Sequence, residues 1–514
     1  MSENECQTVQ ADPSEPATAA PVAARRWTWA SVGGQAGETT QTVITGLILA
    51  FIFRAFFVEP FIIPSGSMAE SLLGAHATRT CPQCGWEYDF APAPTASPAD
   101  GAFVLPAETV CPNCRHSAVP QPEDTIPKAG DRILVHKWLY ALGGLLQPQR
   151  WDVIVFRDPA NPDQHFIKRL IGLPGESLEI VDGDVFINGR IARKTPEAQQ
   201  VLWHIVFDQS HLPEADDAVG RWPRWVALNP PPEDGHGWSG MDTRVIRYDA
   251  PDATPRSIVF NPDTGREYLM DLCGYDGRSS GAFVGDVRIV AEMTLGAGDG
   301  LCRWELTRPP HRFGAELRSG GAVELRMEST DAAAAPPVIH AVQLPAFALG
   351  RPYRIEFGHV DYRVYLKIDQ REVLATTDAE YPPPADAVRD PGLRRPVGLS
   401  VTAANLRLEL RGLRVDRDVY YTPSSDRTRR AAPGNPFVLG ADEYFVLGDN
   451  SPHSHDSREW TEVGPHLPPD YRPGTVRRDQ IVGLAAFVYL PGLLPLDARG
   501  RMRVPDMGRV RFVR

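Results

Sequence analysis

An apolar run covers residues 43–58, where Arg54 is the one charged residue. A helix that crosses a membrane needs about 20 apolar residues, so this run is short. Residues 39–42 can extend it, and the Arg54 side chain can reach the lipid headgroups. A buried core helix is the alternative, but the polar residues upstream could not provide a core to cover it. We therefore predict a transmembrane helix over residues 43–60.

Beyond residue 130 the apolar positions form short runs bounded by turn residues, which is the pattern of β-strands. Residues 131–137 and 151–156 are the first of these runs, and residues 406–410 alternate leucine with a charged residue, as in a strand with one buried face. Similar runs occur at residues 287–291, 322–326, 353–357 and 362–368. The pattern predicts a mainly β protein with an antiparallel sandwich inserted at residues 200–432.

The chain of 514 residues has a net charge of −12, so it lacks the basic surface of a nucleic-acid-binding protein, and we expect no nucleic acid partner. Residues 1–42 are rich in Ala, Pro, Thr, Ser and Gln and predict a disordered tail. Arg25 and Arg26 precede the apolar run, so the positive-inside bias places this tail in the cytoplasm. Everything after Glu59 would then lie outside the cytoplasmic membrane.

Four of the seven cysteines form two Cys-Pro-x-Cys pairs, Cys81 with Cys84 and Cys111 with Cys114. Each turn can direct two thiolates toward one tetrahedral ion, as in the knuckles of a zinc ribbon. Two disulfides are the alternative in an oxidising compartment. We favour structural zinc, bound by a zinc-ribbon-like insert over residues 76–127. Four thiolates would leave no open position on the metal, so it would not be catalytic.

Two further positions carry candidate chemistry. The segment Pro64-Ser65-Gly66-Ser67-Met68 follows the apolar run, and Gly66 permits the tight turn that a serine presented for attack requires. Alone, such a cluster usually marks a polar loop. Lys168 shares one face of a predicted strand with Phe166 and Leu170. Among apolar neighbours the charged form of a lysine loses solvation and its pKa falls, although a surface lysine that extends to solvent is the commoner case.

The two segments resemble boxes of the type I signal peptidases, which are membrane-bound serine proteases. Ser65-Gly66-Ser67-Met68 resembles the nucleophile box, with Glu70-Ser71 in place of the usual Pro-Thr, and the segment from Lys168 to Glu176 matches the box of the general-base lysine. The resemblance implies that Ser67 is the nucleophile, that Lys168 accepts its proton and that Ser65 helps to form the oxyanion hole. Positions that line the family's substrate pockets correspond to Ile63, Pro64, Phe166 and Ile167.

A third segment, residues 444–460, matches the remaining box of the family. The resemblance implies that Ser454 orients the lysine and that the loop is held by Asp449, Asp456 and Arg458. Ser451-Pro452-His453 replaces the common Arg-Asp-Asn, so we expect one supporting ion pair to be missing. A Ser-His-Asp triad that uses His453 or His455 is an alternative, but the lysine box already supplies a base.

The resemblance implies an enzyme of the cytoplasmic membrane that removes signal peptides from exported preproteins and needs no cofactor for catalysis. Its implied partners are signal peptides, the lipid bilayer and the secretion translocon. The matching boxes predict a catalytic domain with its first part in residues 61–75 and 128–199 and its second part in residues 433–514.

Other classes of protein are also compatible with parts of this pattern. The inserted residues 354–422 weakly resemble concanavalin A-like jelly rolls, so an inactive membrane-anchored binding protein is an alternative, against which the intact Ser67, Lys168 and Ser454 argue. A self-cleaving repressor is a second alternative, but those proteins are soluble and carry a DNA-binding module.

Overall fold

The computed structural model describes residues 39–49, 51, 57–93, 104–141, 147–213, 225–228, 235–260, 269–329, 337–383, 397–423, 428–491, 493–495, 503–505 and 507–513. The chain divides into two compact units, Met1–Phe56 and Phe57–Arg514. Most of the tail predicted for residues 1–42 lies outside the described residues.

In the first unit, residues 39–49 form a helix, which begins within the extension expected at residues 39–42. Among the described residues, no helix has both the length and the apolar character needed to span a bilayer. The predicted end of the helix at residue 60 is wrong. Residues 58–62 form strand β1, because their backbone pairs with strand β7, with Val58 opposite His136.

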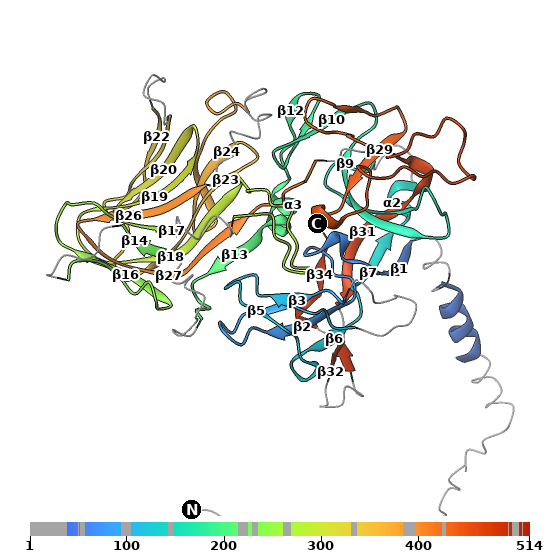
Figure 1. Ribbon diagram of the computed structural model, residues 1–514, viewed down its shortest axis with the longest axis horizontal. Helices are drawn as coiled ribbons and strands as arrows, with labels where there is room; N and C mark the ends of the chain where they lie inside the picture. The colour runs from blue at the N-terminus through green and yellow to red at the C-terminus, as the bar shows by residue number, and fades with distance from the viewer. Residues whose placement is uncertain are drawn as a thin grey trace, which may run out of the picture. The chain divides into compact units, whose positions relative to one another are not determined.

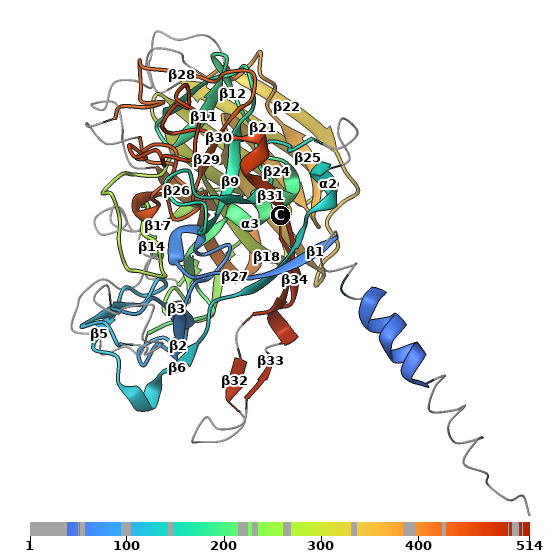
Figure 2. The same ribbon diagram turned by 90° about the vertical axis from the view of Figure 1, so that its right-hand side faces the viewer.

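The second unit contains a sheet of eight strands that carries the candidate catalytic residues (Figure 1). Its spatial order is β1 (Val58–Ile62), β7 (Arg132–His136), β31 (Ile481–Leu490), β8 (Val153–Arg157), β9 (His165–Gly172), β29 (Glu443–Leu447) and β30 (Val476–Arg477), and β34 (Arg511–Phe512) pairs with β31. Both views show β9 beside β29 (Figures 1 and 2). Segments far apart in the sequence thus meet at the centre of this sheet.

Apolar side chains cover both faces of this sheet. Residues 63–75, between β1 and β2, carry Ser67 and are called the serine loop. One face of the sheet packs Met68 and Leu72 of this loop against Ile133 and Val155. The other face packs Phe156, Leu170, Val446 and Trp460 together. The strands predicted at residues 131–137 and 151–156 are confirmed as β7 and β8.

Smaller elements surround this sheet. Helices α2 (Trp138–Ala141) and α3 (Pro196–Leu202) are short, and the Thr195 side chain caps α3 by accepting a hydrogen bond from Ala198 N. A four-stranded sheet is formed by β12 (Arg190–Ile191), β11 (Asp184–Ile187), β10 (Ser177–Val181) and β28 (Phe437–Val438). The hairpin of β32 (Leu493–Pro495) and β33 (Arg503–Pro505) is seen best in Figure 2. The 3-10 helices are η1 (Gly66–Met68), η3 (Pro122–Asp124), η7 (Ser451–His453), η8 (Arg478–Gln480) and η9 (Met507–Arg509).

Two larger sheets form a β-sandwich between residues 204 and 417, drawn mainly in green, yellow and orange (Figure 1). The first sheet contains β15 (Gly237–Ser239), β16 (Val245–Ala250), β27 (Leu406–Arg417), β18 (Val287–Ala297), β23 (Pro352–Val360), β24 (Arg363–Ile368) and β25 (Arg371–Ala375), with β13 (His204–Asp208) beside β27. The second contains β14 (Trp225–Ala227), β17 (Arg256–Phe260), β26 (Gly398–Ala404), β19 (Leu301–Arg308), β20 (His311–Arg318), β21 (Ala322–Ser329) and β22 (Val338–Gln343).

One core joins the two sheets of the sandwich, because Phe357 and Leu408 of the first lie in the same buried cluster as Trp304 and Phe313 of the second. Leu406, Leu408 and Leu410 are buried and Arg407 is exposed, as the alternation predicted. The prediction of a mainly β protein is therefore confirmed.

The segment that carries the four paired cysteines forms two small sheets. Strands β3 (Glu87–Phe90), β2 (His76–Thr80) and β6 (Ile126–Lys128) form one of them. Strands β4 (Thr109–Val110) and β5 (Ser117–Ala118) form the other. The cysteines themselves lie in the turns that precede β3 and β5.

Candidate active site

Ser67 and Lys168, which are distant in the sequence, meet in the structure. Ser67 lies in η1, directly after β1, and Lys168 lies in β9 between β8 and β29, where its backbone is opposite Ile154. The distance between Lys168 Nζ and Ser67 Oγ is 2.6 Å, which is a hydrogen bond. Lys168 Nζ also donates to Ile167 O at 3.1 Å. Because β9 pairs with a strand on each side, its backbone is held in place, and Lys168 Nζ stays within hydrogen-bonding distance of Ser67 Oγ.

Lys168 is only 4% exposed, and its burial weakens the charged form of the amine. Burial lowers the pKa of Lys168 to about 8, a shift that Asp456 and Asp449 oppose and that Arg458 supports. Burial removes water from the ammonium form and destabilises it. Among the described residues no carboxylate pairs directly with this amine to offset the loss. The lowered pKa expected from the sequence is therefore present, with burial as its main cause.

Backbone contacts hold the serine loop against the segment after β29. Asn450 N donates to Ser67 O and Asn450 Nδ2 donates to Gly66 O, both at 3.1 Å. A Cβ atom at Gly448 would overlap both Ser67 O and Ser454 Oγ, so only glycine permits this close approach. The loop that carries Ser67 is thus fixed from the far end of the sequence.

Gly66 is required for a reason other than the tight turn that the sequence suggested. It belongs to the 3-10 helix η1, and a Cβ atom at this position would overlap the ring of Tyr275, which comes from the β-sandwich. The glycine therefore provides room for an aromatic ring of the insertion.

Two buried ion pairs support the loop after β29. Arg169 and Asp449 are both fully buried, and the guanidinium group donates to both carboxylate oxygens at 2.7 and 2.8 Å. Arg458 forms a similar two-pronged pair with Asp456, at 2.7 and 2.8 Å. Asp456 also accepts from Gly448 N at 3.0 Å. These contacts are consistent with the supporting role expected of the two aspartates and of Arg458.

Ser454 lies next to this network, but the expected hydrogen bond to Lys168 is not formed within the part of the chain that the structure describes. Its hydroxyl group is buried and contributes to the lowered pKa of the neighbouring Asp456 carboxyl group. The orienting role of Ser454 stays a prediction.

The side chains of Ser67 and Lys168 face a cleft of about 660 Å³. Ser65, Pro64 and Phe166 also line it, and the Ser65 side chain forms no capping hydrogen bond with η1. Other lining residues come from the cysteine insert and the β-sandwich: Phe90, Glu108, Val110, Tyr275, Asp276 and Arg278. The cleft is therefore built by three parts of the chain.

The four residues predicted to contact substrate are divided between the cleft and the core. Pro64 and Phe166 lie in the wall of the cleft. Ile63 and Ile167 are 2% and 7% exposed and pack in the cluster beneath it, with Met68 and Leu72. A contact of the two isoleucines with substrate stays a prediction.

The two histidines of the alternative triad also line the cleft. His453 Nδ1 lies 2.9 Å from a carboxylate oxygen of Asp276, whereas His455 is exposed. The hydrogen bond that reaches Ser67 Oγ comes from Lys168. This geometry favours the lysine as the base.

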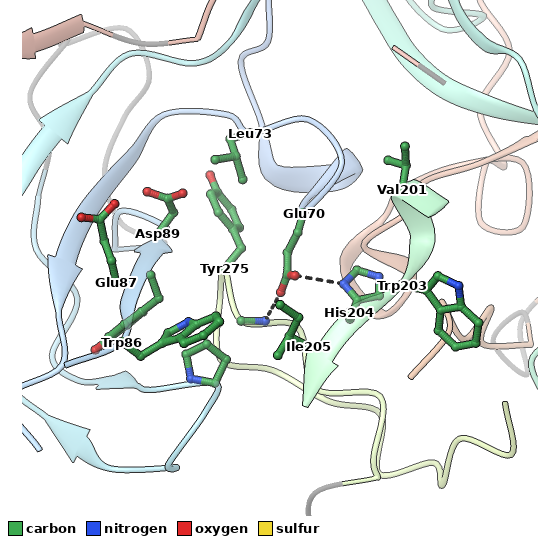
Figure 3. Close-up of a pocket in the computed structure, with 13 residues that line it drawn as sticks. Glu70, Leu73, Trp86, Glu87, Asp89, Val201, Trp203, His204, Ile205 and Tyr275 are labelled. Carbon is green, nitrogen blue, oxygen red and sulfur yellow. Dashed lines mark hydrogen bonds and ion pairs between the residues drawn. The ribbon is translucent and has the colours of Figure 1, made fainter. Parts of the chain in front are cut away.

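A second cavity, of about 320 Å³, lies on another side of the serine loop (Figure 3). Glu70 lines it together with Tyr275 and His204. One Glu70 oxygen accepts from Gly274 N at 2.8 Å, and the other lies 3.0 Å from His204 Nδ1. Gly274 and His204 both belong to the insertion, because His204 lies in β13 and Gly274 lies between β17 and β18.

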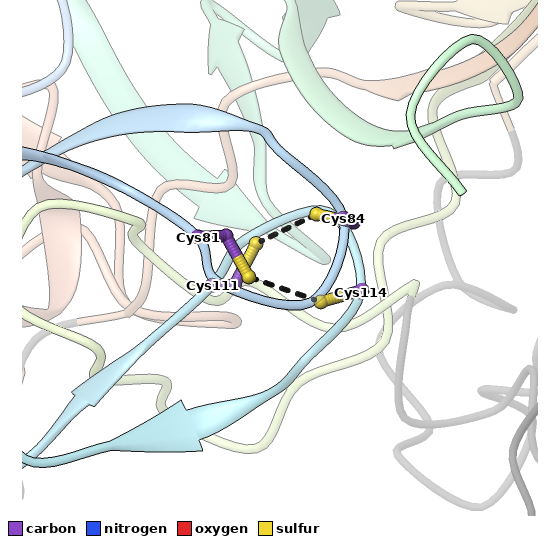
Figure 4. Close-up of side chains that lie close together, drawn as sticks. All are labelled: Cys81, Cys84, Cys111 and Cys114. Atoms are coloured by element: carbon purple, nitrogen blue, oxygen red, sulfur yellow. Dashed lines mark hydrogen bonds between the residues drawn. The ribbon is translucent and has the colours of Figure 1, made fainter. Parts of the chain in front are cut away.

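The four paired cysteines form one buried cluster (Figure 4). Their sulfur atoms all lie within 4.8 Å of one another. The distance is 3.6 Å between the sulfur atoms of Cys81 and Cys114 and 3.7 Å between those of Cys84 and Cys111, and none of the four is in a disulfide bond. Four sulfurs at about 2.3 Å from one tetrahedral zinc ion would lie about 3.8 Å apart. The donor set and spacing therefore fit a metal site.

The two cysteine turns have matching backbones. Gly85 N donates to Cys81 O at 3.0 Å, and Arg115 N donates to Cys111 O at 2.9 Å. Gly85 and Arg115 both have a left-handed φ, at 70° and 63°. Such paired turns direct four thiolates to one point.

Sequence reasoning missed four residues that shape the site, namely Arg169, Gly448, Asn450 and Asp276. Arg169 follows Lys168, and the alternation of the strand indicates only that it points to the opposite face. Asn450 lies in the third matching segment, residues 444–460, but its neighbours in the sequence do not show that it contacts Ser67. Asp276 lies in the insertion, and its polar turn gave no signal.

Comparison with known families agrees with this geometry. Residues 114–213 and 401–490 match the family described as signal peptidase, peptidase S26. These two segments contain Lys168, Ser454 and the buried ion pairs, whereas Ser67 precedes them. Residues 214–400 between them fall within the span of the β-sandwich.

Curated relatives carry the same description. Signal peptidase I of Pseudomonas aeruginosa is 24% identical over 185 residues, which are 34% of this chain and 46% of that protein. The enzyme of Rickettsia akari is 26% identical over 149 residues, 29% of this chain and 42% of that protein. The enzyme of Pseudomonas fluorescens is 28% identical over 153 residues, 28% of this chain and 34% of that protein. The chain thus matches less than half the length of these relatives. The similarities support a peptidase of this family.

Two solved structures have weaker similarity. The carbohydrate-binding module CBM66 of Bacillus subtilis is 11% identical, with a TM-score of 0.24, over 38% of this chain and 95% of that one. A laminarinase of Rhodothermus marinus is 12% identical, with a TM-score of 0.29, over 42% of this chain and 98% of that one. At these TM-scores neither structure supports a statement about this chain.

Proposed function

We propose that the protein is a membrane-anchored serine endopeptidase that removes N-terminal signal peptides from exported preproteins, with Ser67 and Lys168 as its catalytic residues. The hydrogen bond of 2.6 Å between Ser67 Oγ and a buried lysine carries the proposal. A serine hydroxyl attacks a carbonyl only when a base removes its proton, and the burial that lowers the pKa of Lys168 to about 8 supports this role for its amine.

In the proposed mechanism, Ser67 Oγ attacks the scissile carbonyl carbon while Lys168 Nζ accepts its proton. Lys168 then gives the proton to the leaving amine, and water hydrolyses the acyl-enzyme. The Ser67 amide and the Ser65 hydroxyl stabilise the oxyanion. Ser65 is available for this role because it lines the cleft without capping η1.

The substrate enters the cleft in front of Ser67 as an extended segment, with small residues before the cut, as at signal peptide cleavage sites. We further propose that the apolar helix of residues 39–49 and the run that follows it hold the enzyme at the bilayer. Its N-terminus is then cytoplasmic, its catalytic domain is on the extracytoplasmic side, and the translocon that delivers preproteins is a neighbour.

The test is cleavage of a preprotein by the purified full-length protein over a range of pH, with sequencing of the new N-terminus. Only neutral Lys168 accepts a proton, and its pKa is lowered to about 8. We therefore expect kcat/KM to be low at pH 6, to rise with pH through about 8 and to level off above it.

A histidine base would also give an acidic limb, near pH 6.5 unless perturbed. The limb can be assigned by Lys168→Cys followed by aminoethylation, which restores an amine of different pKa. Activity should disappear and then partly return with a shifted limb. An unshifted limb in the rescued enzyme would place the titrating group elsewhere, and a wild-type protein without cleavage would leave the binding-protein alternative.

We also propose that Cys81, Cys84, Cys111 and Cys114 bind one structural zinc ion. Zinc would cross-link the two turns, and without it the insert would lose much of its stability. We expect about one zinc per chain by elemental analysis, and a large loss of zinc in Cys84→Ser.

The matched control is Cys302→Ser, which changes a buried cysteine in the core of the sandwich and should keep the zinc. Protein without zinc, with mass spectrometry showing disulfides among the four cysteines, would contradict the proposal.

A further inference from the structure

The β-sandwich sends one short turn, residues Cys273–Arg278, to the serine loop. The turn is closed by hydrogen bonds from Cys273 N to Arg278 O at 2.8 Å and from Gly277 N to Cys273 O at 2.9 Å. The Tyr275 ring, which is only 5% exposed, packs on Gly66. Its hydroxyl group donates to Ala75 O at 2.8 Å. The insertion thus contacts the serine loop at both of its ends.

Asp276 continues this contact to the nucleophile. Its Oδ2 accepts a hydrogen bond of 2.8 Å from Asn450 Nδ2 and lies 2.9 Å from His453 Nδ1. Asn450 in turn donates to the carbonyl groups of Gly66 and Ser67, both at 3.1 Å. The side chain of Asn450 thus links Asp276 to Gly66 O, and its backbone amide holds the adjacent Ser67 O.

Glu70 ties the other side of the serine loop to the same turn. Its carboxylate accepts from Gly274 N at 2.8 Å and contacts His204 at 3.0 Å, so it bridges the turn and strand β13 (Figure 3). The serine loop is consequently held by the insertion on two sides.

We propose that the turn Cys273–Arg278 is part of the active site and that Asp276 is a positioning residue, which fixes Asn450 and, through it, the direction of Ser67 toward Lys168. The statement rests on the proposed function. It gives the large insertion a role in catalysis that requires no ligand of its own. Without Asp276, Asn450 Nδ2 loses one acceptor and can rotate away from Gly66 O.

A displacement of about 1 Å at a nucleophile can lower the rate of the chemical step by about 100-fold. We therefore expect Asp276→Ala to lower kcat about 10-fold to 100-fold and to change KM less than about twofold, because the substrate is bound but poorly aligned. The acidic limb of the pH profile should stay in place, because the charges that act on the pKa of Lys168 are those of Asp456, Asp449 and Arg458.

Three comparisons separate positioning from other roles. Asp276→Asn keeps an oxygen that can accept from Asn450, so it should restore part of kcat. In a double-mutant cycle, Asp276→Ala with Asn450→Ala should be clearly non-additive. Asp249→Ala removes an aspartate of the same sandwich whose ion pair with Arg407 is exposed, and it should leave kcat unchanged.

A second measurement does not need a substrate. Hydrogen exchange of the peptide over residues 65–72, followed by mass spectrometry, should be faster in Asp276→Ala than in the wild type and unchanged in Asp249→Ala. Faster exchange together with lower kcat supports the proposal.

Unchanged exchange, unchanged kcat, or a rise of KM alone would overturn it, the last because Asp276 would then contact substrate. If the wild-type protein cleaves no preprotein, the proposed function fails, while the exchange experiment still decides whether Asp276 holds the serine loop.

Discussion

Replacing either Ser67 or Lys168 with alanine should reduce preprotein cleavage by at least about 10⁴-fold. Ser67→Ala removes the attacking oxygen, and Lys168→Ala leaves a hydroxyl group whose proton has no acceptor at 2.6 Å. The two losses should not add in the double variant, because the two side chains act as a unit. Cleavage is measured by gel shift of the preprotein and by the N-terminal sequence of the product.

The matched controls use the same residue types away from the hydrogen bond. Ser329→Ala, at the end of β21, and Lys367→Ala, in β24, change exposed or partly exposed side chains of the sandwich and should leave cleavage unchanged. Substantial cleavage by Lys168→Ala would instead identify another base, with His453 as the first candidate because it lines the same cleft.

Breaking the Arg169–Asp449 pair should have the largest effect on stability among single substitutions near the site. Both side chains are fully buried and their contact is bidentate, at 2.7 and 2.8 Å. Asp449→Asn keeps the shape but leaves the Arg169 charge uncompensated inside the protein, which should cost about 3–5 kcal/mol. The free energy of unfolding is measured by denaturant titration of the purified protein.

The control is Asp369→Asn in the exposed pair with Arg351, where the side chains are 40% and 59% exposed. A solvent-exposed pair contributes at most about 1 kcal/mol. Replacing both members of the buried pair, with Arg169→Met and Asp449→Leu, should recover part of the loss, since no unpaired charge remains. Equal effects of Asp449→Asn and Asp369→Asn would show that the buried pair is not the main support of this loop.

Local patterns were sufficient for the strands, whereas Ser67 and Lys168 were singled out by their resemblance to boxes of a known family. The alternation in residues 406–410 predicted the buried face of β27, because burial on one face follows directly from the period of a strand. The apolar neighbours of Lys168 are compatible with its burial and lowered pKa, but a lysine that extends to solvent is the commoner case. The resemblance, and not the adjacent residues, decided between the two.

Contacts between distant segments could not be predicted in this way. The sequence near Arg169 gives no sign of Asp449, and a polar turn such as residues 273–278 has the composition of any surface loop. The loss of one ion pair expected from Ser451-Pro452-His453 stays a prediction. The contact of 2.9 Å between His453 Nδ1 and Asp276 of the insertion could not be predicted from the composition of this segment.

The order of the segments along the chain has a consequence for biosynthesis. Ser67 is made first of the three, the turn with Asp276 follows, and Asn450 is made last. Because the backbone amide of Asn450 holds Ser67 O, a growing chain lacks this support for Ser67 until residue 450 has been made. The alignment of Ser67 with Lys168 is therefore completed by a late folding step, in which the segment after β29 docks on a loop that was made long before it.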